Sequence, residues 1–462
     1  MLDRILLSKL IRKTLSRGGE FADVFVERRR QTSLIIEDQK LEKIITGTKT
    51  GVGIRLLYNG KTFYAFSNDL SERALVRVAS ETSKLAAGKA NATIIDFDTK
   101  TPHLDFAIKE SPESVPLESK IKIVRTIDTA ARGFDSKIKQ VSSIYRDAVQ
   151  EVQIANSEGS FVKDTRVYTT AVVHVIAVQD TIVQTGYEPI GGFIGFELFE
   201  QHNIESLALT AAGRAVMMLS ARKAPGGRMP VVIASHAGGT MIHEAIGHGL
   251  EADLAQQGLS VFSDKRGAQV ASKLVTVIDD ATLPFKRGSF RFDDEGIPSQ
   301  RTMLVEKGIL RNYMYDRHSA MIDGSLSTGN GRRESYQHRP IPRMTNTFIM
   351  EGSVSPEQIV RSLDNGILVA KMGGGQVNTV TGDFVFEVQE GYLIEQGKKS
   401  DPIRGATLTG NGPRVLQSID MVGNDLGYSI GTCGKDSQSV PVSDAMPTIR
   451  IPELVVGGVP DK

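Results

Sequence analysis

Apolar positions in the first half of the chain recur with two different periods, which predict a few helices and several strands. The runs ADVFVERR, SLIIED and GVGIRLLYNGKTFYAFSND have the composition and alternation of strands, and the last contains Asn59-Gly60, a strong signal for a tight hairpin. Helical periodicity predicts one helix near the N-terminus that ends at Gly18-Gly19. It predicts further helices over about residues 71–89, 117–131 and 204–222.

The pattern changes after KAPGGRMP, residues 223–230, where Gly and Pro cluster between periodic segments. Beyond it, a strand VVIAS leads into GGTMIHEAIGHGLEADL, and many short strands with Gly-rich turns follow. Such alternation with frequent turns favours antiparallel, barrel-like sheet. We therefore predict an α+β protein with an N-terminal α/β-type domain, residues 1–222, of strands, a hairpin and helices. The C-terminal domain, residues 223–462, is predicted to be mainly antiparallel β with one motif helix.

Composition and charge narrow the class of protein. The 462 residues are 40% hydrophobic and 24% charged, which is ordinary for a soluble globular chain. The net charge of +1 gives no broad basic surface, so we expect no direct contact with nucleic acid. No run is long and apolar enough for a membrane span, and the N-terminus does not resemble a secretory signal. A single cysteine, Cys433, suits a reducing compartment, so we expect a cytoplasmic protein.

The stretch HEAIGH places His243 and His248 five positions apart, one more than the His-Glu-x-x-His spacing of zinc proteases. On a regular α-helix, residues five apart point about 140° away from each other and could not share one ion. A π-bulge, or a helix that ends between the histidines, would bring them to one side. Gly247 and Gly249 flank the second histidine and tolerate such a distortion. The spacing therefore predicts an irregular helix at Gly247.

A catalytic metal site at this motif competes with a simpler interpretation, in which the histidines are ordinary core or surface residues. Glu244 beside the first histidine favours catalysis, because it could act as general base on a zinc-bound water whose pKa is lowered towards ~7. Such a site needs a third ligand. The residues alone leave two kinds of candidate open: a carboxylate, Glu251 or Asp253, and the thiolate of Cys433, which we expect in a Gly-rich loop.

An arginine-rich segment, GNGRRESYQHRPIPRMTNT, offers a second set of candidates. Arg332, Arg333 and Arg343 are candidates for lining the substrate cleft and steadying a peptide carbonyl or a developing oxyanion. The alternative is a solvated loop whose arginines pair with the acidic residues 293–295.

Several stretches together resemble one family, the TldD/PmbA metallopeptidases, and the TldD branch in particular. The matching stretches occur in the family's order: HEAIGHGLEAD, DDEGIPSQRT, GNGRRESYQHRPIPRMTNTFI, GGGQVNTVTGDFVFEVQEGYLIEQGK, PIRGATLTGNG and GTCGKDSQSVPV. The resemblance implies a metal held by the two histidines of the HExxxH motif and a downstream cysteine, here His243, His248 and Cys433, with Glu244 as the catalytic residue. It implies zinc as the metal, and the ligand set also accepts iron. The C-terminal domain would then be the catalytic one.

The resemblance also implies what the protein does and with whom. It implies a peptidase acting on unfolded or flexible peptides, including leader peptides of modified peptides and small labile proteins. The family's older name is "modulator of DNA gyrase". A TldE/PmbA-type chain is the implied partner in a heterodimer, with a homodimer as the alternative, and the N-terminal domain would serve substrate or partner. Two other functions remain open: a metal-stabilised, non-enzymatic modulator of a toxin or gyrase, and another metal-dependent amide hydrolase.

Overall fold

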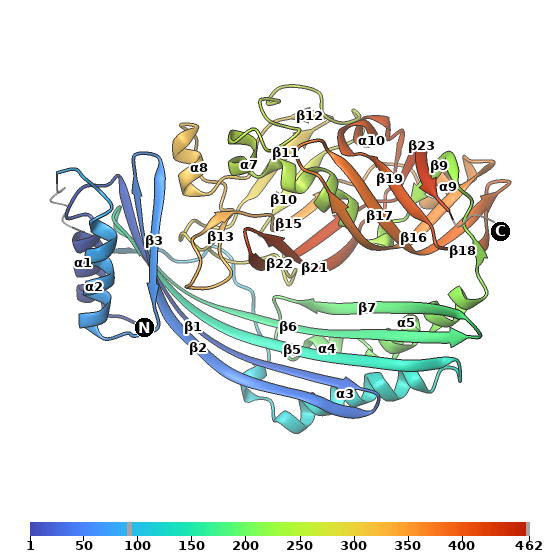
Figure 1. Cartoon of the computed structure of the whole chain (residues 1–462), viewed down its shortest axis with the longest axis horizontal. Helices are drawn as coiled ribbons and strands as arrows, with labels where there is room; N and C mark the ends of the chain where they lie inside the picture. The colour runs from blue at the N-terminus through green and yellow to red at the C-terminus, as the bar shows by residue number, and fades with distance from the viewer. Residues whose placement is uncertain (90–94, 459–462) are drawn as a thin grey trace.

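The long strands of the first half form one curved sheet, which runs along the molecule beneath the second half (Figure 1). The computed structural model describes residues 1–89 and 95–458, and within these ranges seven strands make up the sheet. Their order is β3 (Lys61–Ser67), β2 (Lys40–Tyr58), β1 (Phe21–Glu37), β5 (Ile138–Asn156) and β6 (Ser160–Gln179), with β4 (Asp98–Thr99) and β7 (Ile182–Gly192) both paired to β6.

Two sequence predictions for this sheet meet different outcomes. The hairpin at Asn59-Gly60 is confirmed, because β2 ends at Tyr58, β3 begins at Lys61, and both turn residues have positive φ (50° and 66°). The prediction of two separate strands for the runs ADVFVERR and SLIIED is wrong. The two runs join in the single strand β1, which pairs with β2 along its whole length and with β5 from Asp23 to Glu37.

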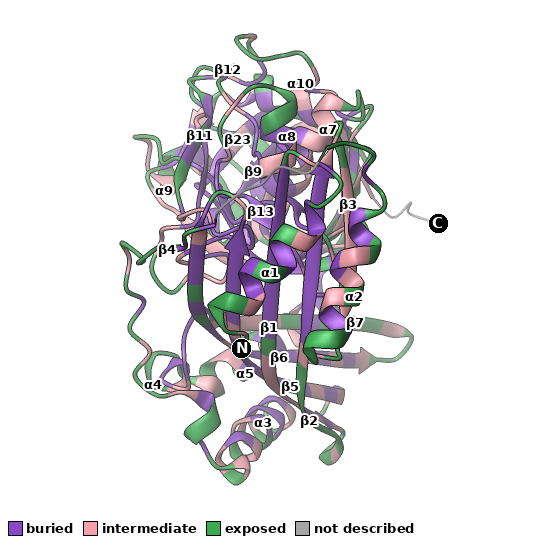
Figure 2. Ribbon diagram, turned by 90° about the vertical axis from the view of Figure 1, so that its left-hand side faces the viewer, coloured by how far each residue is buried: buried purple, intermediate pink, exposed green. Residues whose placement is uncertain are grey.

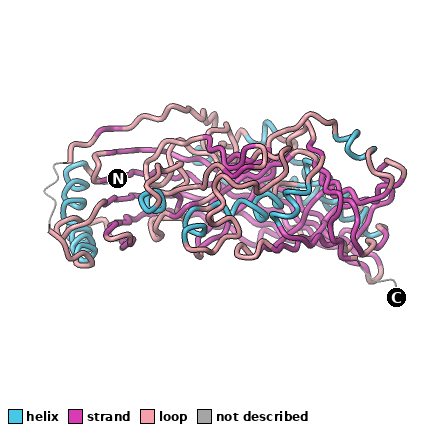
Figure 3. Tube along the Cα trace, turned by 90° about the horizontal axis from the view of Figure 1, so that it is seen from above, coloured by secondary structure: helices cyan, strands magenta, loops and turns pink. Residues whose placement is uncertain are grey.

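Helices cover the sheet in two groups. At one end of the elongated molecule, α1 (Arg4–Thr14) and α2 (Glu72–Ser83) pack together, with Leu10 and Leu75 in one apolar core (Figures 1 and 3). Farther along, α3 (Leu117–Arg132), α4 (Leu198–Gln201) and α5 (Ile204–Leu219) lie on the side of the sheet away from the second half. Small residues of α5, such as Ala211, pack against Val173 of β6. The predicted helices are therefore present, although α2 ends earlier than expected.

The second half contains a barrel-like sheet. Its strands are ordered β16 (Asn365–Val377), β9 (Gly227–Ile233), β23 (Ile449–Gly457), β19 (Thr407–Asn411) and β17 (Asp383–Glu395), and the pairing of β16 with β17 closes the ring. The short or outer strands β18 (Lys398–Arg404), β8 (Arg222–Lys223) and β20 (Met421–Val422) extend it. Most of these pairs are antiparallel. The predicted α+β class with a barrel-like C-terminal part is confirmed.

A second sheet lies beside the barrel and carries residues of the candidate site. Its order is β12 (Ile309–Leu310), β11 (Arg301–Glu306), β10 (Val277–Asp280), β15 (Asn346–Ile349), β22 (Gln438–Met446) and β21 (Gly427–Lys435), so that β21 is an edge strand. Short elements connect the sheets: α6 (Thr240–Ile242), α7 (Ala252–Gln256), α8 (Arg317–Ile322), β13 (Gly331–Arg332), β14 (Ile341–Pro342), α9 (Pro356–Arg361) and α10 (Gly412–Ser418).

We propose that the chain divides into domains near residue 223, as the sequence suggests. In support, α5 ends at Leu219, and from β8 onward the long strands belong to the two sheets of the second half. Among the described residues, none of the helices has the length and apolar character that crossing a membrane requires.

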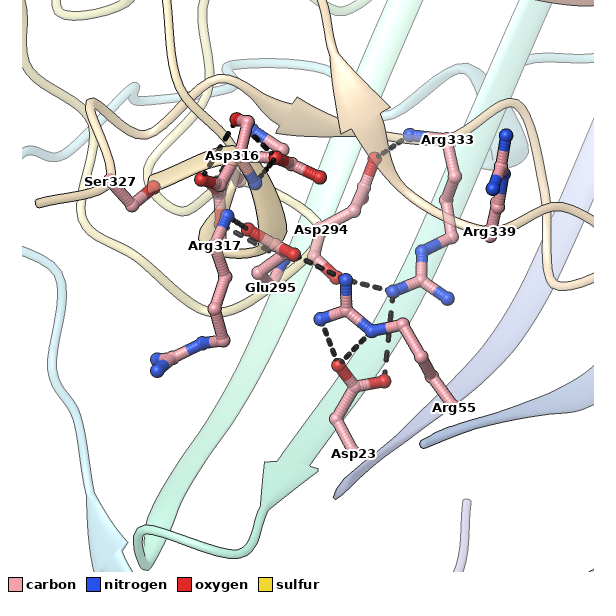
Figure 4. Close-up of polar contacts among 12 residues, drawn as sticks. Asp23, Arg55, Asp294, Glu295, Asp316, Arg317, Ser327, Arg333 and Arg339 are labelled. Carbon is pink, nitrogen blue, oxygen red and sulfur yellow. Dashed lines mark hydrogen bonds and ion pairs between the residues drawn. The ribbon is translucent and has the colours of Figure 1, made fainter. Parts of the chain in front are cut away.

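A buried ion network joins the two halves (Figure 4). Arg55 of β2 donates through Nε to Asp23 of β1 at 2.8 Å and through Nη1 to Glu295 of the second half at 2.6 Å. The side chains of all three are fully buried. Arg333 of the second half lies 3.9 Å from Asp23. The face of the sheet under the second half is accordingly buried over long stretches of its strands (Figure 2).

Candidate metal centre

The motif helix is irregular where the sequence predicts it. After α6, residues His243–Gly247 form a π turn (η3), and His248–Leu250 form a 3-10 turn (η4). The wider π turn accommodates one extra residue, so positions five apart return to the same side. The imidazole rings of His243 and His248 lie 4.9 Å apart between centroids and nearly perpendicular. The predicted distortion at Gly247 is therefore confirmed.

Close packing explains the small residues around this turn. A Cβ on Gly247 would lie 2.2 Å from Sδ of the buried Met344, so a larger residue would push the turn off its support. On the other side, Gly412 of α10 approaches the backbone of Ala245 so closely that an added Cβ would lie 2.6 Å from the Ala245 carbonyl oxygen. The π turn is thus held between α10 and the segment that carries Met344.

Cys433 lies in a strand, and the loop expected from its Gly-rich surroundings is wrong. It belongs to β21, opposite Val440 of β22, and it is only 2% exposed. Its Sγ lies 3.6 Å from Nε2 of His248. The sequence misleads here because the thiol is covered by residues distant in the chain, and its neighbours Thr432 and Gly434 supply none of the apolar alternation that marks a buried strand.

The structure brings three candidate ligands together. The ligand atoms of His243, His248 and Cys433 all lie within 4.8 Å of one another, and these side chains form the group of three potential ligands found among residues 1–89 and 95–458. The two carboxylates considered as alternatives lie elsewhere. Glu251 contacts Nδ1 of His248, and Asp253 accepts from Lys435 Nζ at 2.6 Å. Geometry therefore favours the thiolate as the third ligand.

Each histidine is oriented by a carboxylate on its far side. Asp444 lies 2.8 Å from Nδ1 of His243, and Glu251 lies 3.0 Å from Nδ1 of His248. An ionised carboxylate only accepts, so each Nδ1 donates its proton, and Nε2 is the nitrogen left to bind a metal. Carboxylate–histidine pairs of this kind support metal-binding imidazoles. The donor set of two nitrogens and one thiolate fits zinc with one position left open, as catalytic sites require.

The charges of the site favour a cation at its centre. Burial alone raises the pKa of the Cys433 thiol, but hydrogen bonds and charge from His243 and His248 outweigh it and lower that pKa to about 5. Burial lowers the pKa of His248, whereas the facing Glu251 and Cys433 raise it to about 10. The imidazoles thus face anionic groups that prefer a positive charge nearby, and a proton or a metal ion can supply it.

Glu244 lies on the π turn next to the first histidine and is half-buried. Burial raises the pKa of its carboxyl group, although the two histidines partly oppose that shift. Among the described residues, no hydrogen bond to its carboxylate is found, so its oxygens are free to accept a proton from a bound molecule.

Sequence reasoning missed Asp444 and misjudged Glu251. Asp444 lies in β22, where a lone aspartate in an otherwise buried strand carries no spacing signal. Glu251 was considered as a ligand, yet it is fully buried, and Lys435 Nζ approaches its Oε2 to 3.1 Å. Burial raises the pKa of Glu251, but Lys435 and His248 lower it to about 2, which keeps it ionised beneath the histidine.

The three arginines proposed for substrate binding are all buried, and their hydrogen bonds to the described residues are internal. Arg343 donates to the carbonyl oxygen of Cys433 at 2.5 Å and so braces β21. Arg332 donates to the carbonyl oxygens of Met344 and Pro441 at 2.6 and 2.7 Å. Arg333 donates through Nη2 to the Asp294 carbonyl oxygen at 2.9 Å, and its backbone N–H donates to the Asp294 carboxylate (Figure 4). A role for these arginines in substrate contact stays a prediction.

Replacing Asp444 with asparagine is expected to weaken metal binding by about 10- to 100-fold. The amide no longer supplies the negative charge that holds the Nδ1 proton and aims Nε2 of His243 at the centre. Competition with a chromogenic chelator measures the affinity. Asp280→Asn, which changes another buried strand carboxylate outside the site, should leave it unaltered. Equal metal affinities of wild type, Asp444→Asn and Asp280→Asn would contradict the role of Asp444 in orienting His243.

Family models match nearly the whole chain. They are described as PmbA/TldA metallopeptidase domain 1, over residues 22–86, central domain, over residues 110–219, and C-terminal domain, over residues 226–458. A "Metalloprotease TldD homolog" from Haemophilus influenzae is 37% identical over 451 residues, which are 96% of this chain and 94% of that protein. A metalloprotease from Methanocaldococcus jannaschii is 36% identical over 438 residues, 94% of this chain and 96% of that protein.

Solved structures share the fold at low identity. A putative modulator of a DNA gyrase from Thermotoga maritima superposes with a TM-score of 0.79 at 22% identity, over 95% of this chain and 96% of that one. TldE from Thermococcus kodakarensis superposes with a TM-score of 0.80 at 18% identity, over 98% of this chain and 100% of that one. The fold and the sequence matches together define a metal-dependent peptidase class. The chain belongs to the PmbA/TldD metallopeptidase family.

Proposed function

We propose that this chain is the catalytic, TldD-type member of its family, a peptidase whose metal is held by His243, His248 and Cys433. The observation that carries the proposal is the meeting of these three ligand atoms within 4.8 Å, with Glu244 beside them. We propose zinc as the metal, because two imidazoles and one thiolate suit it and a relative from Saccharolobus solfataricus, 26% identical, is named a zinc metalloprotease. The same ligand set accepts iron.

Glu244 is the proposed catalytic residue. When bound, the metal supplies Lewis acidity, which polarises the scissile carbonyl group and makes water easier to deprotonate. A carboxylate oxygen of Glu244 takes the proton from the attacking water and returns it to the leaving amine. Asp444 and Glu251 hold the proton on Nδ1 of each histidine, so that both rings keep one orientation while the substrate changes.

We propose flexible peptides, including leader peptides and small labile proteins, as substrates. A cleft of about 530 Å³ lies beside the site and is lined by residues from β6, β7, β16, β17 and β21 and by Asp444 of β22. The edge strand β21 carries Cys433, and an extended peptide that paired with this edge would run past the candidate ligands. The register of β16 shifts between Met372 and Gly375, where the glycines at 373 and 374 border the cleft and are released from the regular ladder.

We propose a TldE-type chain as the partner, with a second copy of this chain as the alternative. The supporting observation is that a protein named TldE has the same fold over 98% of this chain. We also place the protein in the cytoplasm, because a thiolate ligand such as Cys433 has to stay reduced to bind metal.

Hydrolysis of a flexible peptide by the full chain, alone and mixed with a TldE-type partner, tests this function. We expect cleavage that is lost after treatment with 1,10-phenanthroline and returns when zinc is added back. Mass spectrometry of the products shows where the peptide is cut. Metal-loaded protein that cleaves no flexible peptide, with or without the partner, would contradict the proposal.

A further inference from the structure

A second polar cavity, of about 200 Å³, lies where the N-terminal sheet meets the second half of the chain. Residues of β1, β5 and β6 form one side of it, and the segments around residues 287–290, 332–334 and 439–441 form the other. Thr432, the neighbour of Cys433 along β21, also lines it. The side chains that dominate its walls are five arginines: Arg29, Arg166, Arg287, Arg332 and Arg333.

The carboxylates of this cavity are already engaged by other donors. Asp294 accepts from Arg166 Nη1 at 2.6 Å and from the backbone N–H of Arg333. Asp293 accepts from three backbone N–H groups, at 2.9, 2.9 and 3.1 Å. Glu334 accepts from the backbone N–H of residue 439 at 2.7 Å. Arg166 is thus paired with Asp294, and the guanidinium of Arg333 lies 3.9 Å from Asp23, whereas the other three arginines have no acidic partner among the described residues.

Three guanidinium groups therefore face the cavity with no carboxylate partner among residues 1–89 and 95–458. Arg29 has no side-chain hydrogen bond within that part of the chain, and its Nε is buried. The guanidinium of Arg287 donates only to the Gly431 carbonyl oxygen, at 2.9 Å, and its buried Nε has no partner among the described residues. Arg332, which is 4% exposed, donates only to backbone carbonyl oxygens.

Such an arrangement is unfavourable unless an anion joins it. Burial lowers the pKa of Arg287 to about 10, and the positive charges of Arg332 and Arg29 add to that shift against the opposing effect of Tyr168. Charge-assisted hydrogen bonds from guanidinium groups to carboxylate or phosphate oxygens are strong and geometrically specific. The unfilled Nε–H and Nη–H donors match that acceptor geometry.

We propose that this cavity binds a small oxyanion, a carboxylate or a phosphate group, between Arg29 of the N-terminal sheet and Arg287 and Arg332 of the second half. One source is the carboxylate of a peptide that lies along the β21 edge, because Thr432 of that strand lines the cavity. This source rests on the proposed peptidase function and would favour substrates with a free C-terminus or an acidic side chain. Free phosphate offers the same chemistry and does not depend on that function.

Calorimetric titration of the full chain with inorganic phosphate, in a low-salt buffer, tests the site itself. We expect binding that weakens by about 10- to 100-fold in Arg29→Gln, the loss expected for one hydrogen bond to a charged group. Because Arg29 makes no side-chain hydrogen bond to the described residues, this variant should fold normally. Arg30→Gln is the matched control, since Arg30 lies next on the same strand and is paired with Glu113 and Glu151. Arg287→Gln should repeat the effect of Arg29→Gln.

Peptides distinguish the two sources. The chain carrying Glu244→Gln, which should leave peptides intact, is titrated with one peptide that has a free C-terminus and with its C-terminally amidated form. Tighter binding of the free form, lost when Arg29→Gln is added, assigns the site to a peptide carboxylate. Phosphate binding without any such difference assigns it to a free anion. Absence of phosphate binding, or equal binding by wild type and Arg29→Gln, would overturn the proposal whether or not the chain proves to be a peptidase.

Discussion

Replacing Glu244 with glutamine is expected to slow peptide hydrolysis by about 100- to 10,000-fold, the range over which a positioned general base contributes. Glutamine keeps the shape of the side chain but cannot take the proton from the attacking water. Because Glu244 is not one of the three clustered ligands, the metal content of the variant should equal that of wild type. Initial rates with a flexible peptide and elemental analysis of the same samples measure both quantities.

The matched control for this variant is Glu306→Gln, which changes an exposed glutamate on β11 that pairs with Arg311. It should cleave peptides at the wild-type rate. Full activity in Glu244→Gln would contradict the assignment of the base. If that variant lost hydrolysis but still modulated a toxin or gyrase, with normal metal content, the non-enzymatic modulator would be favoured instead.

Replacing Arg55 with methionine is expected to destabilise the protein by about 3–5 kcal/mol, as removing one partner of a buried ion pair does. Arg55 is fully buried and holds two carboxylates, Asp23 from its own sheet and Glu295 from the second half. Methionine fills similar space but leaves both charges without their cation. Denaturant unfolding followed by circular dichroism measures the loss in the free energy of unfolding.

Arg228→Met is the matched control for the loss of stability expected in Arg55→Met. Arg228 pairs with Glu453 at 3.0 Å, but both side chains are more than half exposed, so that water screens their attraction. We expect its unfolding curve to coincide with that of wild type. An equally small change in Arg55→Met would show that the buried network does not contribute to joining the two halves.

Local signals in the sequence were sufficient for the irregular motif helix and the hairpin. Five-residue spacing of His243 and His248, with glycine at 247, admits few backbone geometries that bring both rings together, and the π turn is one of them. Asn59-Gly60 likewise prescribes its own turn through positive φ angles. Changes of periodicity also gave the α+β class, because strand alternation and helical spacing are properties of consecutive residues.

The parts that sequence reasoning missed depend on residues distant in the chain. Cys433 is buried by the histidines and by the barrel, so its own neighbours could not reveal the strand. Asp444 acquires its role only because β22 passes behind His243. Arg343, a candidate for the substrate cleft, donates to the Cys433 carbonyl oxygen, a contact that its sequence neighbours do not indicate; its role in substrate contact stays a prediction. The positions of Cys433 and Asp444 at the site thus depend on contacts between segments far apart in the chain.

Elemental analysis of the purified chain beside Cys433→Ala tests the central claim most directly. The account predicts about one equivalent of zinc or iron per wild-type chain and loss of that metal in the variant, because two histidines alone make an incomplete site. Metal retained without the thiolate, or no metal in either protein after growth with both ions supplied, would contradict a centre built from His243, His248 and Cys433.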